Sequence, residues 1–188
     1  MADCFVAGIG ASSGGMHALF EFFKNVKPGM NIAYVVIRHL SRDFPSQFPE
    51  LLQKYTDLKI NTIKGGEELK ADEIYVLPEN KKVYIKDNIL HLVNRPEKEI
   101  VNHAVDFFLC SLAEDRKEKA IGVVLSGVGH DGSACAIKIT NYGGLNVVQD
   151  PQSTQHNGMP MNVIEKDHPK VMQPDDIPEF LRMYTKEK

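Results

Sequence analysis

Short apolar runs alternate with amphipathic segments along most of the chain. The apolar runs end in glycines or polar residues, as expected for strands that are covered on both faces of a sheet. Segments with apolar residues three or four positions apart follow several of these runs and predict helices. The pattern therefore predicts strands at 5–7, 32–37, 59–63, 73–78, 120–125 and 145–149, and helices at 16–23, 45–55, 105–119, 133–141, 163–166 and 177–184.

This alternation predicts an α/β fold with a doubly wound, mostly parallel sheet and helices on both faces. One stretch departs from it, because the apolar segments 83–86 and 89–93 are separated only by Asp87 and Asn88. Such a pattern predicts an antiparallel β-hairpin, which we expect at one edge of the sheet. The 188 residues show no repeat or linker, and 43% are hydrophobic, enough for one substantial core. We expect a single domain over residues 1–188.

Composition narrows the class of protein. With 22 basic and 25 acidic residues the formal net charge is −3, which favours neither nucleic acid nor an anionic membrane as a partner. There is no leader-like N-terminus, and no apolar run approaches the ~20 residues that span a bilayer, so we expect a cytoplasmic protein without membrane insertion. The cysteines Cys4, Cys110 and Cys135 form no C-x-x-C pair. We interpret Cys4 and Cys110 as core residues in a reducing compartment, and the absence of metal-binding motifs predicts no metal site.

A glycine-rich turn follows the first apolar run. The segment 8–15 reads Gly-Ile-Gly-Ala-Ser-Ser-Gly-Gly and leads into the first predicted helix. Glycines allow a sharp turn, and Ser12 at the bend would lie beside a helix N-terminus with unpaired N–H groups. Such a turn can bind a phosphate or can present a serine nucleophile beside an oxyanion site. Ser12 could also be a helix cap, although Ser13 could fill that role as well.

Two further polar side chains follow buried strands. His39 comes after the strand at 32–37, and Asp131 lies in the glycine turn after the strand at 120–125. The carboxyl ends of parallel strands meet at one edge of a sheet, so we expect both side chains near Ser12. Serine, histidine and aspartate together are the groups that acyl transfer needs. The alternatives are a structural histidine at a strand end and an aspartate that caps the helix at 133–141.

The phosphate-binding interpretation has weaker support. The first turn departs from G-x-G-x-x-G because position 13 is serine, and the second strand ends in Arg38 and His39 where the dinucleotide fingerprint needs an acidic residue. Arg38 could instead meet the 2′-phosphate of NADP. An NAD(P)-binding Rossmann protein therefore stands as the alternative function.

Four segments in register over residues 4–182 resemble the catalytic domain of the chemotaxis protein-glutamate methylesterase (CheB) family. Two segments are most similar in sequence to methylesterase domains that are fused to methyltransferases: Ser111-Leu112-Ala113-Glu114-Asp115 and His39-Leu40-Ser41. The four segments are Gly10-Ala11-Ser12-Ser13-Gly14-Gly15, Arg38-His39-Leu40, Leu125-Ser126-Gly127-Val128-Gly129-His130-Asp131-Gly132, and Gln149-Asp150-Pro151 with Gly158-Met159-Pro160.

The resemblance implies a role for each matched residue: Ser12 as nucleophile, His39 as general base and Asp131 as the carboxylate that orients the base. It also places Val128, Gly129 and Met159 in the oxyanion and substrate loops, with backbone N–H groups near His39 and Val128 as oxyanion donors. The implied reaction hydrolyses glutamate γ-methyl esters on chemoreceptors to carboxylate and methanol, and in some members it deamidates glutamine. The resemblance implies no cofactor.

The implied partner is a methylated chemoreceptor-like protein, with a methyltransferase or receiver domain on a longer chain. No receiver domain is expected within these residues. Two segments depart from the family pattern: 102–106 reads Asn-His-Ala-Val-Asp where Arg-Pro-Ser-Val-Asp is common, and Met161 stands where a polar residue is frequent. Both lie in implied substrate loops, so a catalytically silent interaction module of the same fold is a further alternative.

Overall fold

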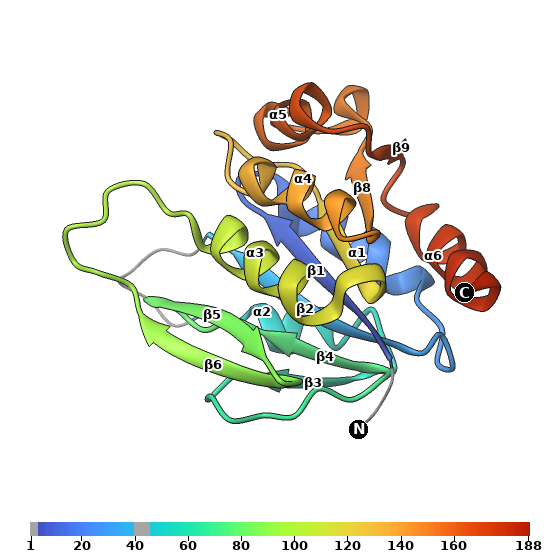
Figure 1. Ribbon diagram of the computed structural model, residues 1–188, viewed down its shortest axis with the longest axis horizontal. Helices are drawn as coiled ribbons and strands as arrows, with labels where there is room; N and C mark the ends of the chain where they lie inside the picture. The colour runs from blue at the N-terminus through green and yellow to red at the C-terminus, as the bar shows by residue number, and fades with distance from the viewer. Residues whose placement is uncertain (1–3, 40–45) are drawn as a thin grey trace.

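A computed structural model describes residues 4–39 and 46–188. Its main feature is a seven-stranded sheet in which every neighbouring pair of strands is parallel (Figure 1). This confirms the predicted doubly wound α/β class. In spatial order the strands are β3 (Lys59–Thr62), β4 (Glu73–Val76), β2 (Ile32–Arg38), β1 (Phe5–Ala11), β7 (Ala120–Val124), β8 (Leu145–Gln149) and β9 (Lys170–Met172).

Helices cover both faces of this sheet. The side chains of α1 (Gly15–Asn25), α2 (Phe48–Leu52) and α6 (Ile177–Glu187) pack in one apolar cluster, and those of α3 (Ala104–Arg116), α4 (Ser133–Asn141) and α5 (Gly158–Lys166) pack in the other. Alternate residues of each central strand point to opposite clusters, as Val6 and Ala7 do. Both faces are therefore buried, which explains why the strands read as continuous apolar runs. Short 3₁₀ turns at Lys117–Lys119 and Pro151–Ser153 complete the elements.

The predicted hairpin is present, but it forms a second sheet. Its strands β5 (Lys81–Lys86) and β6 (Ile89–Asn94) pair only with each other, and α3 packs against β5 (Figure 1). Asp87 and Asn88 both have positive φ, as in a tight hairpin turn. Within the described residues a single isolated bridge, between Glu68 and Ile89, ties this sheet to the chain beside it.

Three helix predictions differ from the structure. The segment predicted as a helix at 45–55 is helical only over Phe48–Leu52, with a proline in its first turn, and its predicted first residue, Pro45, lies outside the described residues. The helix expected at 163–166 begins earlier, at Gly158. In α1, Met16 was predicted on the buried face but is 41% exposed, because the buried stripe centres on Leu19, Phe22 and Phe23 instead.

The cysteine prediction is wrong in one respect. Cys110 in α3 and Cys135 in α4 form a disulfide, whereas Cys4 is buried and takes no part in it, as expected for a core residue. The two bonded residues are 25 positions apart and meet only because α3 packs against α4. The absence of a short cysteine motif therefore gave no sign of the pairing, and the argument for a reducing compartment loses its basis.

Within the described ranges, no helix combines the length and the apolar content that crossing a bilayer requires.

Candidate active site

The three candidate catalytic residues follow neighbouring strands at the centre of the sheet. From β1 the chain runs first to β2 on one side and later to β7 on the other, which makes this the switch point of the topology. Hydrogen bonds continue past the strand ends: the His39 N–H donates to the Ala11 carbonyl at 3.2 Å, and the Ser12 N–H donates to the Ser126 carbonyl at 3.0 Å. Ser12 is therefore held between the segments that carry His39 and Asp131, where ligands of such sheets bind.

The turn after β1 leaves the serine hydroxyl available. Gly14 is the N-cap of α1 with φ 75°, and no side chain caps this helix, so the expectation that Ser13 or Ser12 caps it is wrong. The Gly15 N–H donates to the Ser12 carbonyl at 2.9 Å and closes the turn. Ser12 is half-buried, and among the described residues its hydroxyl makes no hydrogen bond, including to His39. The hydroxyl is thus positioned by its backbone alone.

His39 and Asp131 are in direct contact although 92 residues separate them. The His39 Nε2 lies 2.7 Å from the Asp131 Oδ2, with the two side chains 19% and 3% exposed. Asp131 also accepts hydrogen bonds from the N–H groups of Val105, at 2.9 Å, and Asp106, at 2.8 Å, in the first turn of α3. The alternative that Asp131 caps α4 is therefore wrong, because Gly132 is the N-cap there and Asp131 instead caps α3.

These contacts set the charge of Asp131. Burial by itself would raise the pKa of this carboxyl, but the hydrogen bonds from His39 and from the N–H groups of Asp106 and Val105 bring the pKa below its usual value. The neighbouring Asp106 shows the opposite effect, since burial and the charge of Asp131 raise its pKa. Asp131 is thus the more readily ionised carboxylate of this pair. An ionised carboxylate on one ring nitrogen orients the imidazole and stabilises its protonated form.

The glycine loop after β7 carries the predicted oxyanion residues. Val128 and Gly129 are exposed, and their N–H groups donate to no acceptor within the described parts of the chain. The His39 N–H is already engaged with Ala11, and Leu40 and Ser41 of the family motif lie outside the described residues. Among the described residues, the two predicted oxyanion positions 128 and 129 therefore keep unengaged N–H groups.

Met159 supports this loop from beneath. Its side chain is fully buried, and its N–H donates to the Gly127 carbonyl at 2.9 Å. A Cβ at position 127 would lie 2.1 Å from the Met159 sulfur and 2.9 Å from the Ser12 Cβ. Position 127 therefore has to be glycine for the loop to approach both Ser12 and Met159.

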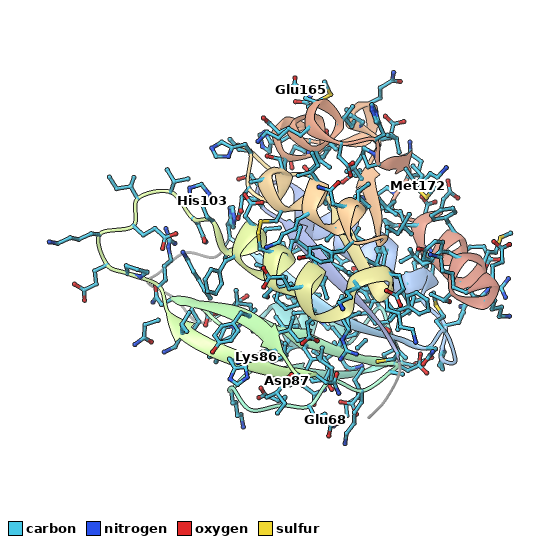
Figure 2. The ribbon with its side chains drawn as sticks, in the orientation of Figure 1. Glu68, Lys86, Asp87, His103, Glu165 and Met172 are labelled. Carbon is cyan, nitrogen blue, oxygen red and sulfur yellow. A yellow bond between two sulfur atoms is a disulfide. The ribbon has the colours of Figure 1, made fainter. Side chains whose placement is uncertain are left out.

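Two hollows flank the candidate triad. One of about 710 Å³ lies between α3, α4 and the hairpin, and His103, Asp106 and His130 are among its lining residues. Figure 2 labels His103 where the loop before α3 meets that helix. The second, of about 370 Å³, has Val128 and Gly129 in one wall and residues 154–158 in the other. The first hollow thus adjoins the segment that carries Asp131, and the second adjoins the predicted oxyanion loop.

Three supporting residues were missed by sequence reasoning. The Ser126 hydroxyl donates to the Ser13 carbonyl at 3.1 Å and accepts from the His156 N–H at 3.1 Å, and Gln149 accepts from the Ser126 N–H at 2.9 Å. Asp106 accepts from the Cys135 N–H at 2.9 Å. Ser126 and Gln149 lie inside matched segments, and an acidic residue in the third position of a helix is a known capping signal, so part of this was detectable.

The site also contains side chains of the kinds that bind metals and dinucleotide phosphates. His103, Asp106 and Asp131 offer ligand atoms within 4.8 Å of one another. Both carboxylates already accept N–H groups from helix first turns, so the donor set fits a hydrogen-bond network better than a metal centre. The Arg38 guanidinium, expected to face a 2′-phosphate in the dinucleotide alternative, instead stacks 4.4 Å from the centroid of the Phe48 ring.

The chain is similar to known proteins over most of its length. Residues 7–181 match the family model described as CheB methylesterase. The chain is 31% identical over 178 residues to a Thermotoga maritima protein named protein-glutamate methylesterase/protein-glutamine glutaminase, and 32% identical over 179 residues to a Vibrio vulnificus protein with that name and the number 2. These alignments cover 92% of this chain but 52% of each relative, so the chain spans about half their length.

A solved structure extends the likeness to three dimensions. The crystal structure of the Thermotoga maritima CheB methylesterase catalytic domain matches with a TM-score of 0.85 and 29% sequence identity. The match covers 96% of this chain and 98% of that one. The resemblance seen in the sequence motifs therefore extends over the whole sheet and its helices.

Proposed function

As the chain belongs to the CheB methylesterase family, we propose that it is a serine esterase that hydrolyses glutamate γ-methyl esters on a methylated chemoreceptor-like protein. The observation that carries this proposal is the 2.7 Å contact between His39 and the buried Asp131, beside a serine whose hydroxyl has no other partner among the described residues. The names of the Thermotoga and Vibrio relatives support the substrate class and also support glutamine deamidation as a second reaction. The matching family is a methylesterase family, which does not support the dinucleotide alternative.

The proposed chemistry assigns one step to each residue. The Ser12 oxygen attacks the γ-carbonyl carbon, and its proton passes to the His39 Nδ1, the ring nitrogen that Asp131 does not occupy. The ester C–O bond then breaks, and the leaving methoxide takes that proton to form methanol. Water attacks the acyl-enzyme with His39 again as base, which releases glutamate and restores Ser12. With a glutamine substrate the same steps release ammonia.

The loop after β7 stabilises the charge that develops in this scheme. The tetrahedral intermediate carries a negative oxygen, and the free N–H groups of Val128 and Gly129 are the donors we assign to it. Asp131 is held ionised by its hydrogen bonds, so it stabilises the protonated imidazole between the two steps. No step of this scheme requires a cofactor.

The proposed setting follows from the same family assignment. We propose that the substrate is the methylated helical region of a receptor and that the protein acts in the cytoplasm. We also propose that a methyltransferase or receiver domain on a longer chain supplies regulation. These residues then serve as the catalytic domain, and control by phosphorylation acts from outside it.

The test is to change Ser12 to alanine and measure methanol release from receptor protein that carries glutamate γ-methyl esters. We expect the rate to fall about 10⁴–10⁶-fold, because removing a serine nucleophile removes the covalent route. A fluorophosphonate probe should label the unaltered protein and not Ser12→Ala. The matched control is Ser13→Ala, since Ser13 is the exposed neighbour and its side chain caps nothing.

Two results would contradict the proposal. Methanol release by Ser12→Ala at the unaltered rate would remove Ser12 from the chemistry. A folded, unaltered protein that is neither labelled nor active on the esters would instead be the catalytically silent module.

A further inference from the structure

We propose that Asp106 is a positioning residue for the triad, because its backbone N–H holds the Asp131 carboxylate and its own carboxylate holds the helix that follows Asp131. The inference rests on the proposed function, since it concerns the residue that orients the general base. Asp106 touches neither His39 nor Ser12 in the described hydrogen bonds, so it acts through Asp131. Four observations support this role.

The first observation is that α3 is capped by a side chain from elsewhere in the chain. His103 is the N-cap residue of α3, but its side chain makes no capping hydrogen bond. The Asp131 carboxylate accepts the Val105 and Asp106 N–H groups instead. A carboxylate at a helix N-terminus is stabilised by the unpaired N–H groups and by the helix dipole. The N-terminus of α3 therefore fixes both oxygens of Asp131.

The second observation is the reciprocal arrangement at α4. Gly132 is the N-cap of α4 and has no side chain to cap with. The Asp106 carboxylate accepts the Cys135 N–H, in the first turn of α4, at 2.9 Å. Asp131, which precedes α4, thus caps α3, and Asp106, which lies in α3, caps α4.

The third observation is that the backbone N–H and the carboxylate of Asp106 both constrain the position of Asp131. The Asp106 N–H holds the Asp131 carboxylate, while the Asp106 carboxylate accepts the Cys135 N–H and so holds the first turn of α4, which begins two residues after Asp131. Losing the side chain of Asp106 releases this backbone, so the carboxylate that contacts His39 shifts. A displacement of the order of ~1 Å in a catalytic group can cost about a hundredfold in rate.

The fourth observation is that the carboxylates of Asp106 and Asp131 lie close together although like charges repel. The half-buried carboxylate of Asp106 lies close to the buried carboxylate of Asp131, and the charge of Asp131 contributes to raising the pKa of Asp106. If the side chain at position 106 only filled space, a neutral apolar side chain would serve as well and would avoid this repulsion. What the site needs at 106 is an acceptor oxygen in reach of the first turn of α4.

The experiment compares three substitutions in the complete chain. Asp106→Asn keeps an acceptor oxygen in place without the charge, and Asp106→Glu keeps the charge but moves it by one methylene. Asp106→Ala removes both. We expect kcat within about threefold of the unaltered protein for Asn, about tenfold lower for Glu and up to about a hundredfold lower for Ala, with KM nearly unchanged.

A second measurement follows the contact itself. The ring N–H that His39 shares with Asp131 gives a low-field proton resonance in NMR spectra. We expect this resonance to be retained in Asp106→Asn and shifted or broadened in Asp106→Glu and Asp106→Ala. It requires no turnover, so it tests the positioning role even if the unaltered protein proves inactive on methyl esters.

The matched control is the double variant Cys110→Ser, Cys135→Ser. It removes the covalent tie between α3 and α4 while leaving the caps at Asp131 and Asp106 in place, and it should keep both kcat and the resonance. The proposal is overturned if this control loses kcat as Asp106→Ala does, or if Asp106→Glu is normal while Asp106→Asn is impaired. An unshifted resonance in the Glu and Ala variants would overturn it as well.

Discussion

The turns after β1 and β7 have similar backbones, but their functional side chains differ in hydrogen bonding. Each leads from a buried parallel strand through glycines into a helix whose N-cap is a glycine with positive φ, Gly14 in one and Gly132 in the other. Neither helix is capped by a side chain of its own turn. Yet the Ser12 hydroxyl makes no hydrogen bond among the described residues, whereas the Asp131 carboxylate accepts three.

This difference follows from what packs against each turn. The N-terminus of α3 faces Asp131 and supplies two donors, whereas within the described residues no helix end supplies a partner to the Ser12 hydroxyl. A nucleophile has to be free to bond with substrate, while an orienting carboxylate has to be immobile. One local backbone design therefore serves both roles, and the neighbouring helix decides which.

After the loss of the Ser12 nucleophile, the largest effect is expected where the immobile turn is broken. Asp131→Asn should lower kcat about 10³–10⁴-fold, because an amide can hold the His39 ring in the wrong tautomer and cannot stabilise its protonated form. The measurement is methanol release under saturating substrate. A kcat within tenfold of the unaltered protein would show that the two turns are less different than their hydrogen bonds indicate.

The same variant tests the charge of Asp131 through stability. The folded-state pKa is lowered, so the unfolded state binds more protons in mildly acidic solution, and the stabilisation is present above about pH 4 and lost as pH falls through the folded-state pKa. Urea titrations at several pH values should show the largest gap between the unaltered protein and Asp131→Asn near neutral pH. The gap should narrow below about pH 4. A gap that does not change with pH would mean that Asp131 is not preferentially ionised in the fold.

The glycine loop after β7, which approaches both Ser12 and Met159, should tolerate few substitutions. Gly127→Ala places a methyl group against the Met159 sulfur and the Ser12 Cβ, so we expect about a hundredfold loss of kcat and about 1–3 kcal/mol of stability. Adding Met159→Ala relieves the contact with sulfur but not the one with Ser12. The double variant should therefore fail to recover kcat, and full recovery would show that the contact with Ser12 is unimportant.

The smallest effect on activity is expected from the disulfide. Cys110→Ser with Cys135→Ser opens a link between residues 25 positions apart, which should cost about 3 kcal/mol of unfolding free energy. Activity should stay within about twofold, because the carboxylate caps at Asp131 and Asp106 remain. Comparing thermal unfolding with and without a dithiol reductant provides the same test in the unaltered chain.

Much of the molecule could be predicted from local patterns. The strands that follow one another as apolar runs, the buried face of α3 and the hairpin turn at Asp87 and Asn88 depend on periodicity and turn preference, which act over a few residues. The same holds for Ser12, His39 and Asp131 as residues that follow central strands. Parallel strands necessarily bring their carboxyl ends to one edge, so the candidate site was visible as a set of strand ends.

The tertiary structure alone decided which groups touch. It paired Cys110 with Cys135, buried Met159 beneath Gly127, and turned Asp131 from a possible cap of its own helix into the cap of α3. Each of these contacts joins residues that are 25 or more positions apart. Local propensity carries no information about such pairs, because they form only when two elements pack together, and the packing depends on the shapes of both.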